Sequence, residues 1–120
     1  MLMGNKNNIR PQIGDWFSFH DAVDSNVRQW TVSDYVKYSD EGIGVMILTQ
    51  TLLLLNGFKK IDEGCYQYHK DNIKIWLYRG MDVYTDGGSY RLPFPSFVHK
   101  FQQNLRICGL VELADNFKVK

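Results

Sequence analysis

The sequence predicts an α+β fold, in which blocks of strands and single helices follow one another along the chain. Three observations lead to this prediction. Short segments in which polar and apolar residues alternate fill residues 13–47 and 58–92. Four consecutive leucines, Leu52–Leu55, lie between these two blocks. An apolar stripe at helical spacing follows the second block, between Pro95 and Gly109.

The first block contains four strand-like segments, separated by short turns. Their bounds are 13–20, 27–32, 35–38 and 43–47. The gaps at 21–26 and 39–42 are rich in Asp, Ser, Asn and Gly, which favour turns because they bend or hydrogen-bond the backbone locally. Four short strands with brief turns predict a small curled sheet or an SH3-like β-barrel.

A short helix is predicted from Gln50 to Asn56. Thr49 can cap it, because its hydroxyl can accept a hydrogen bond from a backbone N–H of the first turn. Gly57 can end it by adopting a left-handed backbone conformation. Leucines occupy nearly the whole circumference of this helix, so we expect it to be buried on more than one side.

The second block predicts an antiparallel meander. Its strand-like segments are 58–61, 65–69, 73–79, 83–85 and 89–92. The turns between them are Glu63-Gly64, Asp71-Asn72, Gly80-Met81-Asp82 and Asp86-Gly87-Gly88.

An amphipathic helix ends the pattern. Ser96 is its predicted N-cap and Gly109 its stop. Its apolar stripe consists of Phe97, Val98, Phe101, Leu105 and Cys108. Its polar face consists of Lys100, Gln102, Gln103 and Arg106. The remaining segment, 110–117, fits a strand or a second short helix.

The composition indicates one globular domain. Hydrophobic residues make up 44% and charged residues 22% of the 120 residues, a balance that excludes intrinsic disorder. We expect a flexible leader at 1–12 and one compact domain at 13–120, with subdomains 13–48 and 49–120. The longest apolar run is too short to span a bilayer, and the polar leader lacks the apolar stretch of a signal peptide. We therefore expect a cytoplasmic protein that does not bind a membrane.

The charges are unevenly distributed along the chain. The net charge is +1, so no overall field points to nucleic acid or a membrane surface. Residues 1–58 hold four Lys and Arg against six Asp and Glu, whereas residues 59–120 hold ten against seven. The second half of the chain is therefore mildly basic.

Aromatic residues crowd into the meander on strand-like segments. Lys74, Trp76 and Tyr78 share a strand face opposite Ile73, Ile75 and Leu77. The candidate binding residues of this region are Tyr66, Tyr68, Lys74, Trp76, Tyr78, Arg79 and Tyr84. Such a face fits three interpretations: a second core covered by the N-terminal strands or the leucine helix, an interface for a protein partner or a second copy, or a stacking surface for single-stranded nucleic acid.

Other chemistry-bearing residues fit structural roles better. His20, His69 and His99 lack the tight spacing of a zinc site with Cys65 or Cys108. Nothing local activates either cysteine as a nucleophile. Three aspartates lie at predicted turns, where Asp is favoured because it hydrogen-bonds the local backbone: Asp71, Asp82 and Asp86. The segment Asp86-Gly87-Gly88-Ser89 does not precede a helix, as a phosphate-binding loop would. No catalytic residue, metal site or cofactor is predicted.

Three blocks carry a resemblance to a known group of proteins. They are Ile13-Gly14-Asp15-Trp16-Phe17, Leu52-Leu53-Leu54-Leu55-Asn56-Gly57-Phe58 and Phe97-Val98-His99-Lys100-Phe101-Gln102. In this order and at these separations, the blocks resemble a group of small uncharacterised proteins from prophages and mobile elements of gut bacteria. The resemblance covers roughly the whole chain. The acidic first turn that the group has before its leucine helix is replaced here by Thr49-Gln50-Thr51.

The resemblance implies a mobile-element context but carries over no activity and no site residue. Together with the aromatic face, it leads to the expectation of a non-enzymatic interaction module that binds a host or phage protein, with modulation of host defence as one role. The alternative is a nucleic-acid-binding accessory protein that uses the same aromatic and basic face. The identity of the partner does not follow from the residues.

Overall fold

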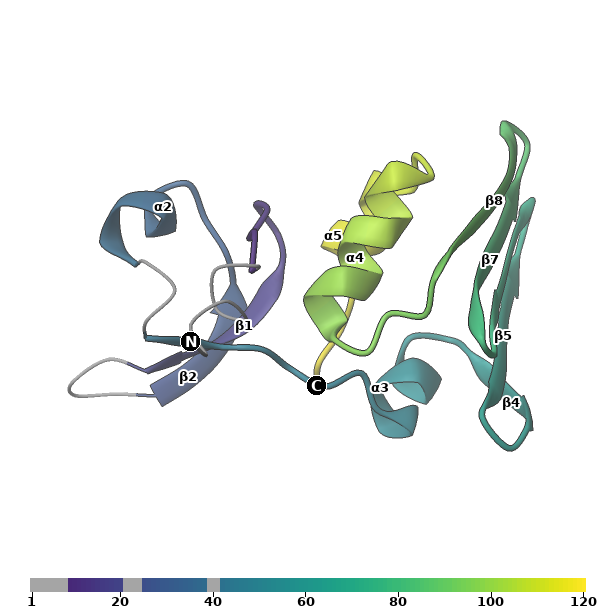
Figure 1. Cartoon of the computed structure of the whole chain (residues 1–120), viewed down its shortest axis with the longest axis horizontal. Helices are drawn as coiled ribbons and strands as arrows, with labels where there is room; N and C mark the ends of the chain where they lie inside the picture. The colour runs from purple at the N-terminus through teal and green to yellow at the C-terminus, as the bar shows by residue number, and fades with distance from the viewer. Residues whose placement is uncertain (1–8, 21–24, 39–41) are drawn as a thin grey trace.

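The computed structural model describes residues 9–20, 25–38 and 42–120. It has the predicted α+β class, with two antiparallel sheets of three and five strands. Helices α3 (Gln50–Leu55), α4 (Val98–Ile107) and α5 (Val111–Asp115) lie between the two sheets (Figure 1). The centres of the turns predicted at 21–26 and 39–42, and residues 1–8 of the predicted leader, lie outside the described residues.

The smaller sheet is open, and the predicted SH3-like barrel is not found among the described residues. Strand β1 (Trp16–His20) lies in the centre, with β2 (Ser25–Gln29) and β3 (Ile43–Gly44) on its two sides. The alternation seen in the sequence gives this sheet a small core of its own. Its buried side chains are Phe17, Phe19, Trp30 and Ile43.

The strand predicted at 35–38 is wrong, because a short helix, α2 (Asp34–Lys37), occupies this segment. Asp34 is buried, and its carboxylate accepts hydrogen bonds from the Thr31 backbone N–H at 2.8 Å and from both terminal nitrogens of Arg28 at 2.7 Å. The Arg28 guanidinium lowers the pKa of Asp34 to about 2. These bonds bend the chain tightly at Thr31, and a tight bend is incompatible with an extended strand.

The strand predicted at 43–47 is shorter than expected. After Gly44 the chain leaves the small sheet and runs beside the segment that enters α4. Ile47 forms an isolated antiparallel bridge with Phe97, and the Val98 N–H donates to the Met46 carbonyl oxygen at 2.8 Å. Backbone groups that would have extended the sheet are thus satisfied by the start of a distant helix.

The larger sheet confirms the predicted meander. Its strands are β4 (Lys59–Asp62), β5 (Cys65–Lys70), β6 (Ile73–Leu77), β7 (Gly80–Thr85) and β8 (Gly88–Pro93), and their spatial order follows their order in the sequence. Asp71-Asn72 and Asp86-Gly87 form two-residue turns, since Lys70 pairs with Ile73 and Thr85 pairs with Gly88. The turn predicted at Gly80-Met81-Asp82 is wrong: the bend lies at Tyr78-Arg79, and Met81 is a buried strand residue paired with Leu77. Asp71 has a φ of 53°, a conformation that Asp and Asn tolerate better than most residues.

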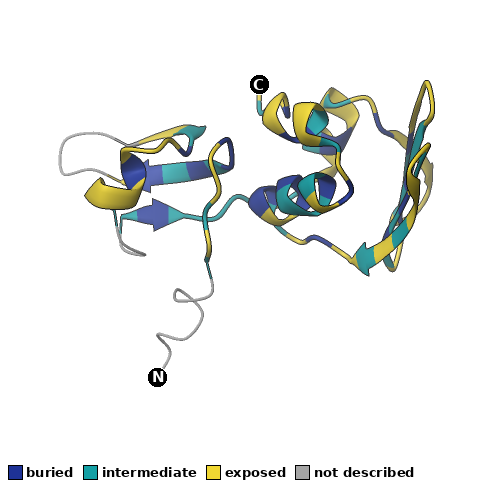
Figure 2. Ribbon diagram, turned by 90° about the horizontal axis from the view of Figure 1, so that it is seen from above, coloured by how far each residue is buried: buried dark blue, intermediate teal, exposed yellow. Residues whose placement is uncertain are grey.

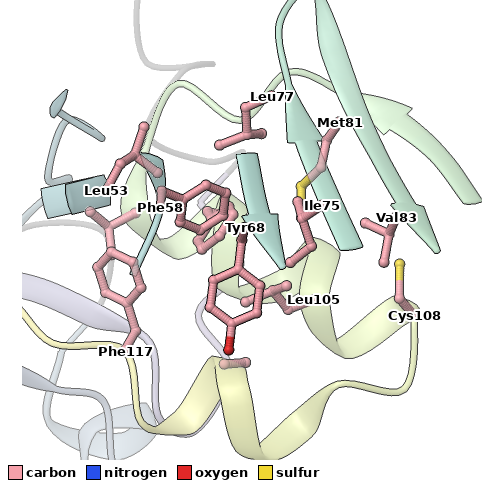
Figure 3. Close-up of a cluster of buried hydrophobic side chains, with 13 residues drawn as sticks. Leu53, Phe58, Tyr68, Ile75, Leu77, Met81, Val83, Leu105, Cys108 and Phe117 are labelled. Carbon is pink, nitrogen blue, oxygen red and sulfur yellow. The ribbon is translucent and has the colours of Figure 1, made fainter. Parts of the chain in front are cut away.

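The main core lies between one face of this sheet and the helices. Ile75, Leu77, Met81 and Val83 of the sheet pack with Leu105 of α4 and other apolar residues of the helices (Figure 3). Figure 2 shows the same layering from above, with the helices on the side of the sheet that faces the smaller sheet. The opposite side of the larger sheet has no helix or strand packed on it in the described part of the chain.

The leucine helix lies where it was predicted, but it is less buried than predicted. The Thr49 hydroxyl accepts from the Leu52 N–H at 3.2 Å, and Gly57 follows the helix with a φ of 90°, as expected. Only Leu53 is fully buried, whereas Leu54 and Leu55 are 47% and 43% exposed. The prediction of burial on several sides is wrong, because the helix packs on the core through one face only.

The last helix begins one residue later than a Ser96 cap requires. Phe97 is the N-cap residue and makes no side-chain capping bond, while the Ser96 carbonyl accepts from the Leu48 N–H at 3.0 Å. Gly109, with a φ of 82°, follows the helix as predicted. The alternative left open for 110–117 is resolved in favour of a second helix, α5.

The two sheets are joined through polar side chains of α4. Gln102 is fully buried, although its position in the helix predicted a polar surface. Its Oε1 accepts from the Trp16 N–H at 2.9 Å, and its Nε2 donates to the carbonyl oxygens of Gly14 and Ala114. The first and third sequence blocks are therefore in direct contact.

A buried ion pair adds to this joint. Arg106 donates to the fully buried Asp15 carboxylate and to Asp115. Burial raises the pKa of Asp15 more than the hydrogen bonds from Arg106 and Gln103 lower it. The end of the predicted leader also contacts this region, because the Gln103 amide donates to the Arg10 carbonyl at 2.8 Å.

Candidate functional site

Strand register defines a surface on the larger sheet, which we call the outer face. Residues that are paired across neighbouring strands point to the same side of a sheet. One row of partners crosses every strand of the sheet: Lys59, Gln67, Trp76, Asp82 and Arg91. A second row consists of His69, Lys74, Tyr84 and Ser89. Tyr78 follows Trp76 by two residues and extends the same side of β6.

The outer face is the side of the sheet that no described helix or strand covers (Figures 1 and 2). The helices instead cover the opposite side, through Ile75, Leu77 and Val83, which have no exposed surface. On the outer face Trp76 is half-buried, while Tyr78 and Tyr84 are 54% and 45% exposed. The interpretation of this face as a second core is therefore not supported by the packing.

The predicted binding residues divide into two groups. Lys74, Trp76, Tyr78 and Tyr84 lie together on the outer face, with Arg79 in the turn that follows Tyr78. The other two tyrosines lie on the core side, because Tyr66 pairs with Leu77 and Tyr68 pairs with Ile75.

The contacts of the two tyrosines show that they serve the core. Tyr68 is buried among core residues, with its ring 5.4 Å from that of Phe58 (Figure 3). Tyr66 packs at the edge of the same core, and its hydroxyl donates to Gln50 Oε1 of α3 at 2.9 Å. Neither tyrosine can contribute to a contact surface with Trp76.

Two side-chain pairs order one end of the outer face. The Arg79 guanidinium lies over the Tyr78 ring, 5.3 Å from its centroid. Arg91 donates from Nε to Asp82 Oδ1 at 2.9 Å, and the Asp82 carboxylate raises the pKa of Arg91. Planar guanidinium groups held beside rings can bind carboxylates or phosphates while the ring offers apolar contact.

Three cations of the outer face form no ion pair within the described residues. Lys59, Lys74 and Arg79 form no ion pair within the described residues, whereas Arg91 is paired with Asp82. The neighbouring strands add His69, which is exposed beside Lys74. Cations around exposed aromatic rings are typical of surfaces that bind proteins or single-stranded nucleic acids.

The remaining chemistry-bearing residues are dispersed. His20 ends β1, His69 is on the outer face and His99 is buried in α4. No group of His, Cys, Asp and Glu within the described residues could hold a metal ion. Cys65 and Cys108 are both free, and burial raises the pKa of the Cys108 thiol, which disfavours the nucleophilic thiolate.

The aspartates singled out in the sequence are divided as well. Asp82 binds Arg91 on the outer face, whereas Asp86 accepts from the Asn72 amide at 2.6 Å where two turns meet. Asp71 occupies its own turn with a left-handed backbone. Asp71 and Asp86 therefore lie in turns as predicted, whereas the turn predicted for Asp82 is wrong, because Asp82 lies within β7 and binds Arg91 of β8.

Sequence reasoning missed His69 and Asp82 as members of the outer face, although it had Lys59 and Arg91 among the basic residues near the aromatic rings. A signal for them was present in the turns. A two-residue turn at Asp71-Asn72 pairs Lys70 with Ile73, and counting outwards from this pair puts Tyr68 opposite Ile75. The same counting from Asp86-Gly87 puts Arg91 opposite Asp82.

No helix in the described part of the chain is long and apolar enough to cross a membrane. In comparisons with protein-family models, curated proteins and solved structures, nothing matches this chain.

Proposed function

We propose that the chain is a non-enzymatic interaction module, encoded by a phage or mobile genetic element, that binds a host or phage protein in the cytoplasm through its outer face. One observation carries the proposal: Trp76 and its aromatic neighbours lie on a sheet face that no described element covers. Modulation of host defence is one role for such a module.

Aromatic residues at protein interfaces support this choice. Tyr, Trp and Arg are enriched among the residues that contribute most to binding energy. Trp76, Tyr78 and Arg79 supply all three types within a few residues of one another, and Asp82 with Arg91 supplies a polar rim. Binding would occlude or tether the partner, since no described group is placed to do chemistry on it.

An affinity capture from host lysate, with and without nuclease, tests the proposal. Wild-type protein should retain a nuclease-resistant partner that Trp76→Ala loses. Val36→Ala is the matched control, because Val36 is 93% exposed on α2, in the other half of the molecule. Failure of wild type to capture any protein, or equal capture by Trp76→Ala, would contradict the proposal.

Stability separates loss of binding from loss of folding. Trp76→Ala should lower the free energy of unfolding by about 1 kcal/mol. A buried aromatic residue would cost about 3–5 kcal/mol. Urea unfolding of the purified variant measures this difference.

Binding of single-stranded nucleic acid is the second candidate. The observation that favours it is Lys74, which lies beside Trp76 along β6 and opposite Tyr84 across the sheet. Bases can stack on rings while cations neutralise phosphates. Capture that disappears with nuclease, together with an affinity that falls steeply with salt, would select this candidate over a protein partner.

A further inference from the structure

The outer face has an open hollow near the turn between β6 and β7. It has a volume of about 550 Å³ and is lined by Tyr78, Arg79, Asp82 and Arg91, with Leu92 and Pro93 as apolar neighbours. Arg91 is already bound to Asp82, whereas the Arg79 guanidinium lies over the Tyr78 ring and forms no ion pair within the described residues. A cation next to a ring and an apolar wall suits a carboxylate on an aliphatic stem.

A second hollow lies toward the other end of the same face. It has a volume of about 430 Å³ and is lined by His69, Lys74, Trp76 and Tyr84, with Asp71 and Asn72 in the adjoining turn. Lys74 is half-buried between two aromatic side chains, Trp76 on its own strand and Tyr84 on the next. This hollow again combines a cation with rings.

The two hollows lie along one strand. Lys74 lies in β6, and Tyr78, whose ring is next to Arg79, follows it by four residues, one residue past the end of the strand. At the rise of an extended chain, this step is at most about 13 Å. An extended peptide that lies over the outer face along β6 therefore brings side chains four positions apart to the two hollows.

We infer that the outer face takes an extended acidic peptide segment of its protein partner, with one carboxylate at Arg79 and a second, four residues away, at Lys74. The inference rests on the proposed function and names the chemistry of the segment that is bound. Charge complementarity carries it: Lys59, Lys74 and Arg79 have no ion-pair partner within the described residues, and Trp76 lies between the cations at the two ends.

The arrangement favours a peptide over a nucleic acid. Asp82 lies next to Trp76 in the row that crosses the sheet, and Asp71 lies at the rim of the second hollow. A phosphate chain carries a negative charge at every nucleotide, but between Lys74 and Arg79 it would meet Trp76 and the paired Arg91 and Asp82, which offer no unpaired cation. A peptide can place one carboxylate at Arg79 and one at Lys74 and carry neutral side chains over Trp76, between them.

Selection of a random nonapeptide library on the immobilised protein tests the inference. Wild type should enrich peptides that carry Asp or Glu at two positions four apart, by at least tenfold over the unselected library. The variant with Lys74→Glu and Arg79→Glu should enrich Lys or Arg at those positions instead. Lys118→Glu is the control, because Lys118 is exposed outside the sheet and should leave the wild-type preference unchanged.

The outcomes separate this inference from the proposed function. Enriched peptides that require Trp76 but show no acidic preference would overturn the inference and leave the protein-binding module standing. No enrichment at all would also overturn the inference, and the lysate capture would then decide the proposed function by itself. Tighter binding of a random single-stranded DNA 20-mer than of the selected peptides would overturn both.

Discussion

His99 is a titratable residue buried among aromatic rings. It is 1% exposed, and its ring lies 5.0 Å from that of Phe17 and 6.0 Å from that of Phe97. Neither ring nitrogen has a hydrogen-bond partner within the described protein. Burial first, and the nearby Lys100 charge second, lower the pKa of His99 to about 4. A neutral imidazole is thus held in the contact between the small sheet and α4.

Protonation of His99 should destabilise the fold in mild acid. The unfolded chain binds this proton with a pKa of about 6.5 and the folded chain only near 4, so the stability from neutral His99 is complete above pH 6.5 and is lost as the pH falls toward 4. The loss across this window should be about 3 kcal/mol. Asp15 acts in the opposite sense, because its raised pKa favours the folded state as the pH falls.

Replacing His99 isolates its contribution. His99→Phe should be at least as stable as wild type at pH 7, because both orphaned nitrogens are removed, and it should no longer lose the His99 contribution to stability as the pH falls from 6.5 to 4. Urea unfolding at several pH values measures this effect. His69→Gln is the control, since His69 is exposed and should keep the wild-type profile. An unchanged profile in His99→Phe would refute the assignment.

Helix α3 shows how the same residue type acquires different roles within one element. Leu53 is 3% exposed and belongs to the main core, while its neighbour Leu54 is 47% exposed. The helix was predicted correctly from its cap and its stop, which are local signals. Which of its leucines is buried depends on the side from which the core approaches.

The two leucines make a matched pair for mutation. Leu53→Ala should lower the free energy of unfolding by about 2–5 kcal/mol, because a cavity is left in the core. Leu54→Ala should change it by no more than about 0.5 kcal/mol. Leu53→Asp should leave the protein unfolded or insoluble, since a carboxylate would be buried without a partner. Equal costs for the two alanine variants would contradict the orientation of the helix.

At the scale of the whole molecule, α4 holds the two sheets together. It gives Phe101 and Leu105 to the main core and presents Gln102, Gln103 and Arg106 to the segment that leads into the small sheet. Arg106 reaches Asp15 and Asp115 at once. The joint is polar, so its stability depends on every hydrogen bond being made.

Gln102→Leu should weaken this joint selectively. It removes the partner of the Trp16 N–H, at a cost of about 1–3 kcal/mol for the group left unpaired, whereas the Gly14 and Ala114 carbonyls keep Gln29 and Phe117 as donors. Amide hydrogen exchange should rise in β1 more than in β6, which the substitution does not touch. Gln67→Leu on the outer face is the control and should leave both strands protected. Uniform loss of protection would argue against a separable joint.

Local patterns determined much of this protein. The meander, the two main helices and the α+β class follow from residue alternation, helical spacing and turn residues, because these are interactions between near neighbours in the chain. The alternation in residues 73–78 predicted that Lys74, Trp76 and Tyr78 share one side, whereas the position of Tyr84 next to Lys74 follows from the pairing of β7 with β6. The opposite placement of Tyr66 and Tyr68 required the register as well, which the turn at Asp71-Asn72 fixes.

Other features were decided by specific side-chain contacts, some local and some between distant parts of the chain. Residues 35–38 alternate like a strand but form a helix, because Asp34 binds Arg28 and Thr31. The sequence places Gln102 on a polar helix face, yet its side chain is hydrogen-bonded to the backbone of Gly14 and Trp16. His99 could be a surface or a core residue from the sequence, and in the structure its ring contacts Phe17. Each outcome depends on a partner distant in the sequence or on side-chain geometry, and no local pattern encodes which surfaces of the folded chain meet.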